Sequence, residues 1–132
     1  MAKMVQAVNI YGPKVDHKPT AQIDKISEWI SMRTGLNKSD VLMAFTEISD
    51  AILFYNRDGA AVKILGVGTF SPYIDRAGEF SVHFRADMAL KNGINAPGNY
   101  QGELLNKDRI GLSDEDYKAL WDAEHPEDLL EI

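Results

Sequence analysis

The side chains that most often carry out chemistry are scattered along this sequence. The three histidines, His17, His83 and His125, lie in different segments, and none pairs with another at the spacing of a helical metal site. Three consecutive acids at residues 114–116 fit the first turn of a helix, where carboxylates interact favourably with the helix dipole. No cysteine is present, which excludes disulfides, thiolate metal sites and a cysteine nucleophile. We therefore expect no catalytic residue, no metal and no cofactor.

Two glycines at Gly66 and Gly68 could suggest a phosphate-binding loop. They lack both the Gly-x-Gly-x-x-Gly spacing and a following helix, and they lie between predicted strands. The Gly-x-Ser-x-Gly and His-Glu-x-x-His motifs of hydrolases are also absent from the sequence. The sequence therefore predicts a protein that is not an enzyme.

Basic side chains that could bind phosphate remain as candidates, but acids outnumber them. Lys and Arg total 14 and Asp and Glu total 20, for a formal charge of −6. Residues 1–19 carry three bases and one acid, residues 20–95 carry eight and nine, and residues 96–132 carry three and ten. A typical nucleic-acid binder clusters far more Lys and Arg. The acidity is thus concentrated at the C-terminal end, and the middle of the chain is nearly neutral.

The length and composition are those of a small globular protein. The 132 residues include 45% hydrophobic ones, which is enough for one real core. No apolar run reaches the roughly 18 residues that a membrane span needs. Residues 1–10 contain no apolar stretch typical of a secretory signal. We expect a cytoplasmic protein with no membrane partner.

Two amphipathic helices are predicted first, over residues 21–34 and from residue 38 to Tyr55. Thr20 is the predicted N-cap of the first helix, and Gly35 supplies its stop. Asn37 is the predicted cap of the second helix. The short connection between them predicts a helical hairpin.

The hydrophobic period then changes from 3.6 to 2, which is typical of strands. Residues 61–65 predict one strand, and residues 71–75 and 80–86 predict the two arms of a hairpin. In the second arm the apolar face comprises Phe80, Val82 and Phe84, and the polar face comprises Ser81, His83 and Arg85. Residues 88–91 predict the start of a short helix of one or two turns, which is expected to end at Gly93. The predicted fold class is α+β with a three-stranded antiparallel sheet.

The two ends of the chain are read as extensions of this central segment. Residues 1–19 form an N-terminal extension, in which residues 4–10 predict a short strand that either joins the sheet edge or reaches a partner subunit. Residues 96–132 form an acidic C-terminal extension with a short helix over about 114–125, capped by Ser113. The apolar side of this helix, which could dock on the body of the protein, comprises Leu112, Tyr117, Leu120 and Trp121.

Four segments between residues 20 and 95 carry a family resemblance. They are residues 33–41 (Arg-Thr-Gly-Leu-Asn-Lys-Ser-Asp-Val), 59–64 (Gly-Ala-Ala-Val-Lys-Ile), 66–70 (Gly-Val-Gly-Thr-Phe) and 84–95, which begins Phe-Arg-Ala-Asp. In this order they resemble the HU/IHF family of bacterial histone-like, DNA-bending proteins. The resemblance implies an HU-like domain over residues 20–95.

The resemblance also implies an intertwined homodimer, in which the helices of both chains form a shared base under a saddle-shaped sheet. The apolar stripes agree, because one thin sheet over a helix pair cannot cover them, and burying a Phe or Ile contributes about 1.5–3 kcal/mol. The expected dimer core comprises Ile26, Ile30, Phe45, Ile48, Ile52, Phe70, Phe80, Val82 and Phe84. Alternatively, the C-terminal helix or the N-terminal strand covers this surface within one chain.

The sequence departs from the family where the family's long β-ribbon arm would be. In the family that arm follows the minor groove and ends in a proline that wedges between base pairs. Here only residues 75–79 join the two strands, and the Arg-Asn-Pro tip is absent. Pro72 lies early in its strand, where it marks an edge or a bulge. We expect a short arm.

The resemblance implies phosphate contacts by four basic residues: Lys63, Arg76, Arg85 and Lys91. Lys63 is also explained as an exposed strand lysine that needs no partner. The sequence thus predicts a nucleoid-associated homodimer that binds double-stranded DNA weakly, through phosphates and without sequence preference. The alternative is a dimeric protein-interaction or assembly module on the same scaffold, with DNA binding lost.

Overall fold

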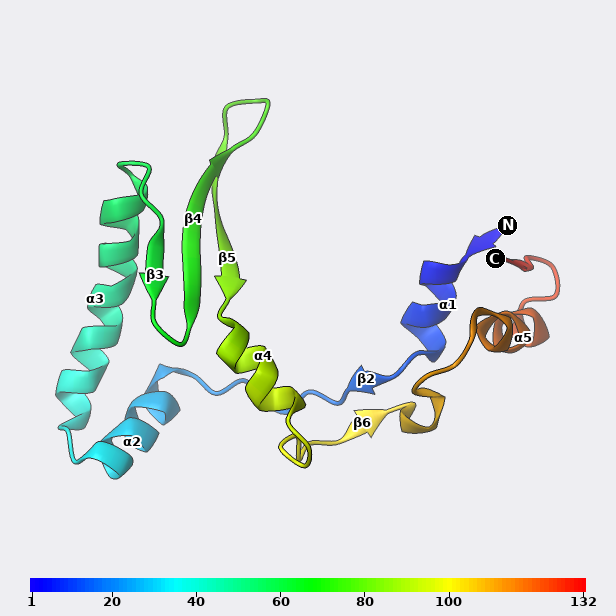
Figure 1. Cartoon of the computed structure of the whole chain (residues 1–132), viewed down its shortest axis with the longest axis horizontal. Helices are drawn as coiled ribbons and strands as arrows, with labels where there is room; N and C mark the ends of the chain where they lie inside the picture. Colours follow the sequence, from blue (N-terminus) through cyan, green and yellow to red (C-terminus); the bar gives the residue numbers. More distant parts are fainter. The chain divides into compact units, whose positions relative to one another are not determined.

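The computed structural model describes residues 1–132, and its internal contacts divide the chain into two compact units (Figure 1). Unit 1 combines both ends of the chain, Met1–Lys18 with Gln101–Ile132. Unit 2 is the intervening segment, Pro19–Tyr100. Most of the predicted N-terminal and C-terminal extensions therefore pack together in a single unit.

Unit 2 combines a helical hairpin, a three-stranded sheet and a final short helix (Figure 1). Its elements in chain order are α2 (Ile23–Thr34), α3 (Lys38–Asn56), β3 (Val62–Ile64), β4 (Gly68–Ile74), β5 (Phe80–Ala86) and α4 (Met88–Asn95). The strand order is β3-β4-β5, and both neighbouring pairs are antiparallel. The predicted α+β class is confirmed.

Local backbone chemistry sets the ends of the hairpin helices. Gly35 ends α2 in the left-handed conformation at φ 77° and donates to Ser31 O at 2.9 Å. The Asn37 side chain caps α3 by accepting from Ser39 N at 2.9 Å, as predicted. The predicted cap at Thr20 is wrong: Gln22, with an extended backbone, accepts the first helical hydrogen bond, and its side chain makes no cap.

The last helix of unit 2 runs further than predicted. We expected it to end at Gly93, but α4 continues to Asn95. Side chains satisfy the carbonyls of this last turn, since Asn95 Nδ2 donates to Lys91 O at 2.9 Å and Asn99 Nδ2 donates to Gly93 O at 2.6 Å. These bonds offset the weak helix propensity of glycine.

The sheet has one apolar and one polar face. On the apolar face, Phe70 and Phe84 lie opposite each other, with ring centroids 4.7 Å apart. Asn56 links the end of α3 to this sheet, because its Nδ2 donates to Phe70 O at 3.3 Å. Beyond Phe70, β4 pairs only with β5, so Pro72 lies where β4 has become an edge strand, as predicted.

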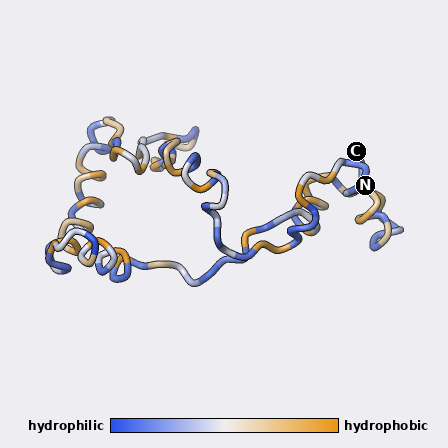
Figure 2. The backbone as a smooth tube through the Cα atoms, turned by 60° about the horizontal axis from the view of Figure 1, so that its bottom comes forward, coloured by the Kyte–Doolittle hydropathy of each residue, from blue (hydrophilic) through white to orange (hydrophobic).

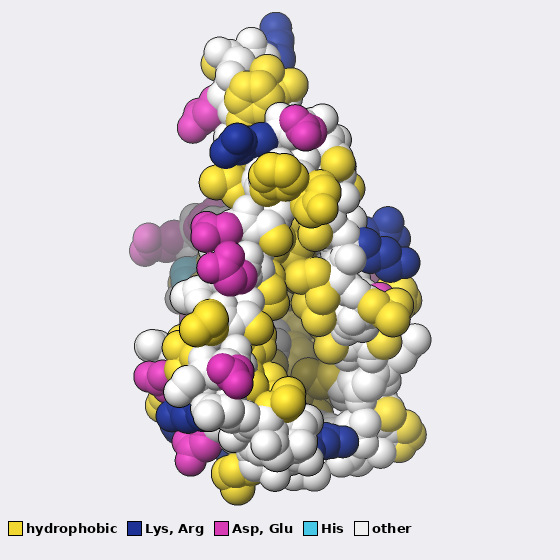
Figure 3. Space-filling model, turned by 90° about the vertical axis from the view of Figure 1, so that its left-hand side faces the viewer, with side chains coloured by type: hydrophobic (Ala, Val, Ile, Leu, Met, Phe, Trp, Pro, Cys, Tyr) yellow, Lys and Arg dark blue, Asp and Glu magenta, His cyan; other side chains and the backbone are white.

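Unit 2 buries few of its hydrophobic side chains. Val41, which is 8% exposed, is its only buried hydrophobic residue. The residues of the expected dimer core are exposed or half-buried, and Phe80 is the most exposed of them at 75%. Hydrophobic and hydrophilic stretches alternate along the backbone (Figure 2). Figure 3 views the molecule from the side on which α2 and α3 lie in Figure 1, and there hydrophobic side chains, coloured yellow, line a hollow. An apolar surface is therefore left open in the single chain.

Unit 1 begins with a helix where the sequence predicted a strand. Its elements are β1 (Ala2–Lys3), α1 (Met4–Tyr11), β2 (Lys14–Val15), β6 (Leu104–Leu105), a 3-10 turn η1 (Lys107–Arg109), α5 (Asp114–Glu124) and β7 (Leu130–Glu131). The predicted strand over residues 4–10 is wrong because Ala7 and Tyr11 recur at helical spacing, and both are buried in the core that α1 forms with α5.

Two short strand pairs join the ends of the chain in unit 1. β1 pairs in parallel with β7, and β2 pairs antiparallel with β6. The backbone amide of Asp16 extends the second pair by donating to Glu103 O at 3.0 Å. Residues about a hundred positions apart in sequence thus become neighbours.

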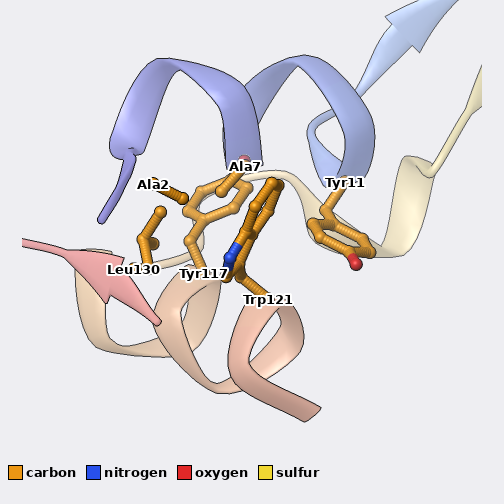
Figure 4. Close-up of a cluster of buried hydrophobic side chains, with 6 residues drawn as sticks. All are labelled: Ala2, Ala7, Tyr11, Tyr117, Trp121 and Leu130. Atoms are coloured by element: carbon orange, nitrogen blue, oxygen red, sulfur yellow. The ribbon is translucent and has the colours of Figure 1, made fainter. Parts of the chain in front are cut away.

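The core of unit 1 is aromatic (Figure 4). The Tyr11 and Trp121 rings meet edge to face, with centroids 6.4 Å apart. Trp121 Nε1 donates to Asp128 O at 2.6 Å, and the Tyr11 hydroxyl donates to Glu124 Oε2 at 2.7 Å. Burial and this bond to Glu124 raise the pKa of Tyr11. The buried hydrophobic residues of this core are Ala2, Ala7, Tyr11, Tyr117, Trp121 and Leu130.

The C-terminal helix begins as predicted and uses its apolar side within unit 1. Ser113 caps α5 in a capping box with Asp116, and the helix ends at Glu124, one residue before the predicted end. Tyr117 and Trp121 are buried against the N-terminal segment. The apolar side of α5, which the sequence suggested could dock on the body of the protein, therefore packs against α1 instead.

Candidate nucleic-acid interface

The candidate interface is the polar face of the sheet in unit 2. The register pairs Lys63 on β3 with Thr69 on β4, and Thr69 with Arg85 on β5. Residues in one cross-strand row project to the same face. Lys63 and Arg85 thus flank Thr69 on one face, opposite to the face of Phe70 and Phe84.

The other two predicted contact residues lie beyond the two ends of β5. Arg76 is exposed in the turn between β4 and β5, and Lys91 is exposed on α4. Since β5 has seven residues, it spans roughly 24 Å, so Arg76 and Lys91 are far from each other. The structure brings Lys63 and Arg85 together on one row, and it does not bring Arg76 and Lys91 together.

The acids beside these basic residues are engaged by the backbone. Asp75 Oδ1 accepts from the amides of Ala77 at 2.8 Å and Glu79 at 2.9 Å. Asp87 Oδ1 caps α4 by accepting from Ala89 N at 2.8 Å. These carboxylates therefore stabilise a turn and a helix start.

The basic residues of unit 2 are not paired with acids. The three ion pairs of the chain all lie in unit 1 and involve the N-terminal amine, Lys3 and Lys118. No carboxylate lies within 4.0 Å of the charged atoms of Lys63, Arg76, Arg85 or Lys91. Their charges are free to meet an anion.

Two other side chains on the same face, Tyr73 and His83, were not among the predicted phosphate contacts. Tyr73 and His83 are exposed, and their rings stack with centroids 4.4 Å apart. Alternation along β5 already grouped His83 with Arg85, but only the register of β4 against β5 brings Tyr73 beside them.

No group of three or more His, Asp or Glu side chains in the chain could hold a metal ion. None of its helices is long and apolar enough to cross a membrane.

The glycines that suggested a phosphate loop have a structural explanation. Gly66 has φ 79° in the turn between β3 and β4. Gly68 lies so close to Phe84 that an added Cβ would come within 2.5 Å of its ring. Gly66 thus allows the turn between β3 and β4, and Gly68 allows the close packing of Phe84 on the apolar face.

The helical hairpin, the antiparallel sheet with its β4–β5 hairpin and the final helix define an HU-like fold. Residues 4–96 match the family HU-HIG, described as an HU domain fused to wHTH, Ig, or Glycine-rich motif. Because the match covers more than half of the chain, this protein belongs to that family. The predicted HU-like family is confirmed.

The solved structures that are similar to part of the chain include two HU proteins. A single-residue mutant of HU from Thermotoga maritima is 20% identical, with a TM-score of 0.47, and the match covers 56% of this chain and 99% of that one. The Anabaena HU–DNA cocrystal structure is 12% identical, with a TM-score of 0.48 and coverage of 58% and 100%. No curated protein matches this chain in sequence.

Proposed function

We propose that this chain is a non-catalytic, nucleoid-associated protein that binds double-stranded DNA as a homodimer, through phosphates and without sequence preference. The observation that carries this proposal is the row of Lys63, Thr69 and Arg85 on the polar sheet face, where both basic side chains lack an acidic partner. Phosphate contacts from Lys and Arg supply most of the affinity in sequence-independent DNA binding. Membership of an HU-domain family supports the same function.

The open apolar surface of unit 2 supports the homodimer. A groove of about 580 Å³ opens between the end of α3 and the β4–β5 hairpin, lined by Leu53, Asn56, Arg57, Gly59, Pro72, Tyr73, Ile74, Phe80, Ser81 and Val82. A second copy would cover the apolar side chains that α3 and the apolar sheet face contribute to this groove, at about 1.5–3 kcal/mol for each buried side chain.

Binding should be weak for two reasons. The turn between β4 and β5 is short and carries no proline at residues 75–79, so minor-groove wrapping and a proline wedge are not expected. Unit 1 carries six basic and eleven acidic residues, and this excess of negative charge repels phosphate.

The test is a gel-shift assay on random-sequence duplex at two salt concentrations. Four to six phosphate contacts per dimer predict a slope of log K against log salt of roughly −4 to −5. Affinity should therefore fall about 250- to 1,000-fold between about 50 and about 200 mM salt. The double variant Arg85→Glu and Lys91→Glu should abolish retardation at low salt. The matched control, Lys14→Glu and Lys18→Glu, makes the same charge change in unit 1 and should retain it.

The acidic charge of the chain favours one other function, a dimeric protein-interaction or assembly module that does not bind DNA. The same assay separates the two. Wild-type protein that forms dimers but gives no retardation even at low salt would support this second function and contradict the first.

The homodimer is tested by sedimentation of the full chain at micromolar concentration. A dimer is expected, and Val82→Asp should weaken it at least tenfold, because it puts a charge on the apolar face of β5. Leu65→Asp, in the exposed turn after β3, is the matched control and should leave the dimer unchanged. A stable wild-type monomer would exclude the homodimer.

A further inference from the structure

The stacked rings of Tyr73 and His83 form an unusual feature of the polar sheet face. Tyr73 lies opposite Ser81 and His83 lies opposite Ser71, so the two rings meet diagonally across the strand pair. Their planes differ by 29°, which is close to parallel. The stack holds the imidazole in place although both side chains are exposed.

The hydrogen bonding of His83 leaves one ring nitrogen free. Nε2 lies 3.3 Å from the Ser81 hydroxyl, which can either donate or accept. This contact therefore persists in both the neutral and the protonated imidazole. Nδ1 has no hydrogen-bond partner in the chain, and the imidazole has no ion-pair partner. A protonated His83 thus has an N–H group available to an anion.

The charged surroundings of His83 are basic on one side and acidic at the turn. The titratable or charged side chains on this face are Lys63 from β3, Tyr73 and Asp75 from β4 and its turn, Glu79 from the turn, and Arg85 from β5. Asp75 Oδ1 is held by two backbone amides of the turn. His83 and Arg85 are two residues apart on one face of β5, which is about 7 Å. A phosphate backbone that contacts Arg85 would therefore pass within reach of His83.

We propose that protonated His83, oriented by Tyr73 and Ser81, is a further phosphate contact of the DNA-binding face. This inference rests on the proposed function. Histidine is the side chain that changes charge between pH 5 and pH 8. A phosphate bound beside the imidazole favours its protonated form, because opposite charges attract. DNA binding should thus take up a proton at His83 and become stronger as the pH falls.

The experiment measures DNA affinity of the full chain at about pH 5.5 and about pH 7.5, at constant ionic strength. Wild-type protein should bind about tenfold more tightly at the lower pH, and its salt slope should steepen by up to about 1.8 per dimer, or 0.9 per subunit. His83→Gln should bind within about twofold of wild type at the higher pH and lose the gain at the lower pH. Tyr73→Ala should reduce that gain, and Tyr73→Phe should restore it, because a phenyl ring keeps the stack.

The matched control is His17→Gln, which removes an exposed histidine of unit 1 and should keep the full pH dependence. A pH dependence that His83→Gln retains, in a protein that binds DNA, would overturn this inference and leave the proposed function intact. Absence of DNA binding by the wild-type chain at both pH values would overturn the proposed function and this inference together.

Discussion

Ser27 shows how one small side chain can limit the stability of unit 2. It lies on α2, whose main packing partner is α3, and its side chain is completely buried. Its Oγ has no hydrogen-bond partner. A buried hydroxyl without a partner costs about 1–3 kcal/mol. Its small size nevertheless suits the close approach of two helices.

Replacing Ser27 by alanine should stabilise the protein. Ser27→Ala removes the unsatisfied oxygen at nearly constant volume, and we expect the free energy of unfolding to rise by about 1 kcal/mol. Urea denaturation followed by circular dichroism measures this change. Ser49→Ala is the matched control, because this serine of α3 is exposed and its Oγ makes only one long hydrogen bond, to Thr46 O at 3.4 Å. A loss of stability in Ser27→Ala would contradict the conclusion that the buried hydroxyl is unsatisfied.

At the scale of elements, charged hydrogen bonds around the β1–β7 pair make the stability of unit 1 depend on pH. Asp122 on α5 accepts from Lys118 Nζ at 2.8 Å and from the Leu130 amide at 2.8 Å, and Lys3 pairs with Glu131 beside it. The pKa of Asp122 is lowered most by the hydrogen bond from Lys118 and next by the hydrogen bond from the Leu130 amide. The hydrogen bond from Lys3 lowers the pKa of Glu131. Both carboxylates are thus more acidic in the folded unit than in the unfolded chain.

Unit 1 should therefore lose stability in acid. A carboxyl group whose folded pKa is lowered stabilises the fold above its unfolded pKa, and this stabilisation disappears as the pH falls through the folded value. The unfolded values are about 3.8 for Asp122 and 4.5 for Glu131, so the loss begins near pH 4.5 and continues below it.

The measurement follows Trp121 fluorescence during urea unfolding between about pH 6 and pH 3, in a Trp29→Phe background. Asp122→Asn should flatten the pH dependence most, because it removes the carboxylate charge that accepts both hydrogen bonds. Asp114→Asn, at the exposed start of α5, is the control. A wild-type unit 1 with equal stability at both ends of this range would contradict the assignment.

At the scale of the whole molecule, an acidic unit and a nearly neutral HU-like unit share one chain. The effect of the acidic charge on DNA cannot be tested by deleting residues 96–132, because α5 completes the core around Tyr11. Neutralising exposed acids leaves that core intact. Asp116 is kept because it closes the capping box.

We expect the triple variant Asp114→Asn, Glu115→Gln and Glu127→Gln to bind DNA about two- to fivefold more tightly at about 50 mM salt, because fewer negative charges repel phosphate. The gain should shrink at about 200 mM salt, where screening is stronger. Gel-shift titrations measure both. An affinity equal to that of wild type at low salt would show that the acids of unit 1 do not influence binding.

The sequence by itself determined the class and the elements of unit 2. Helical and strand periods, the Asn37 cap and the glycine stop at Gly35 are local signals, and they act through backbone chemistry over a few residues. Alternation along β5 separated its polar face from its apolar face for the same reason. The predicted cap at Thr20 and the predicted end of α4 were wrong by two residues each, and local side-chain bonds carry α4 to Asn95. The strand predicted over residues 4–10 was wrong because packing against α5 outweighed the local preference.

Only the tertiary structure decided what depends on residues far apart in the sequence. Pairing of β1 with β7 and packing of α1 on α5 joined the two chain ends, which no local pattern could reveal. The strand register put Lys63 and Arg85 in one cross-strand row and Tyr73 diagonally beside His83. A shift by one residue would have moved each side chain of the shifted strand to the opposite face. The chemistry of the candidate interface therefore depends on long-range pairing, whereas the elements that carry it follow from short-range preferences.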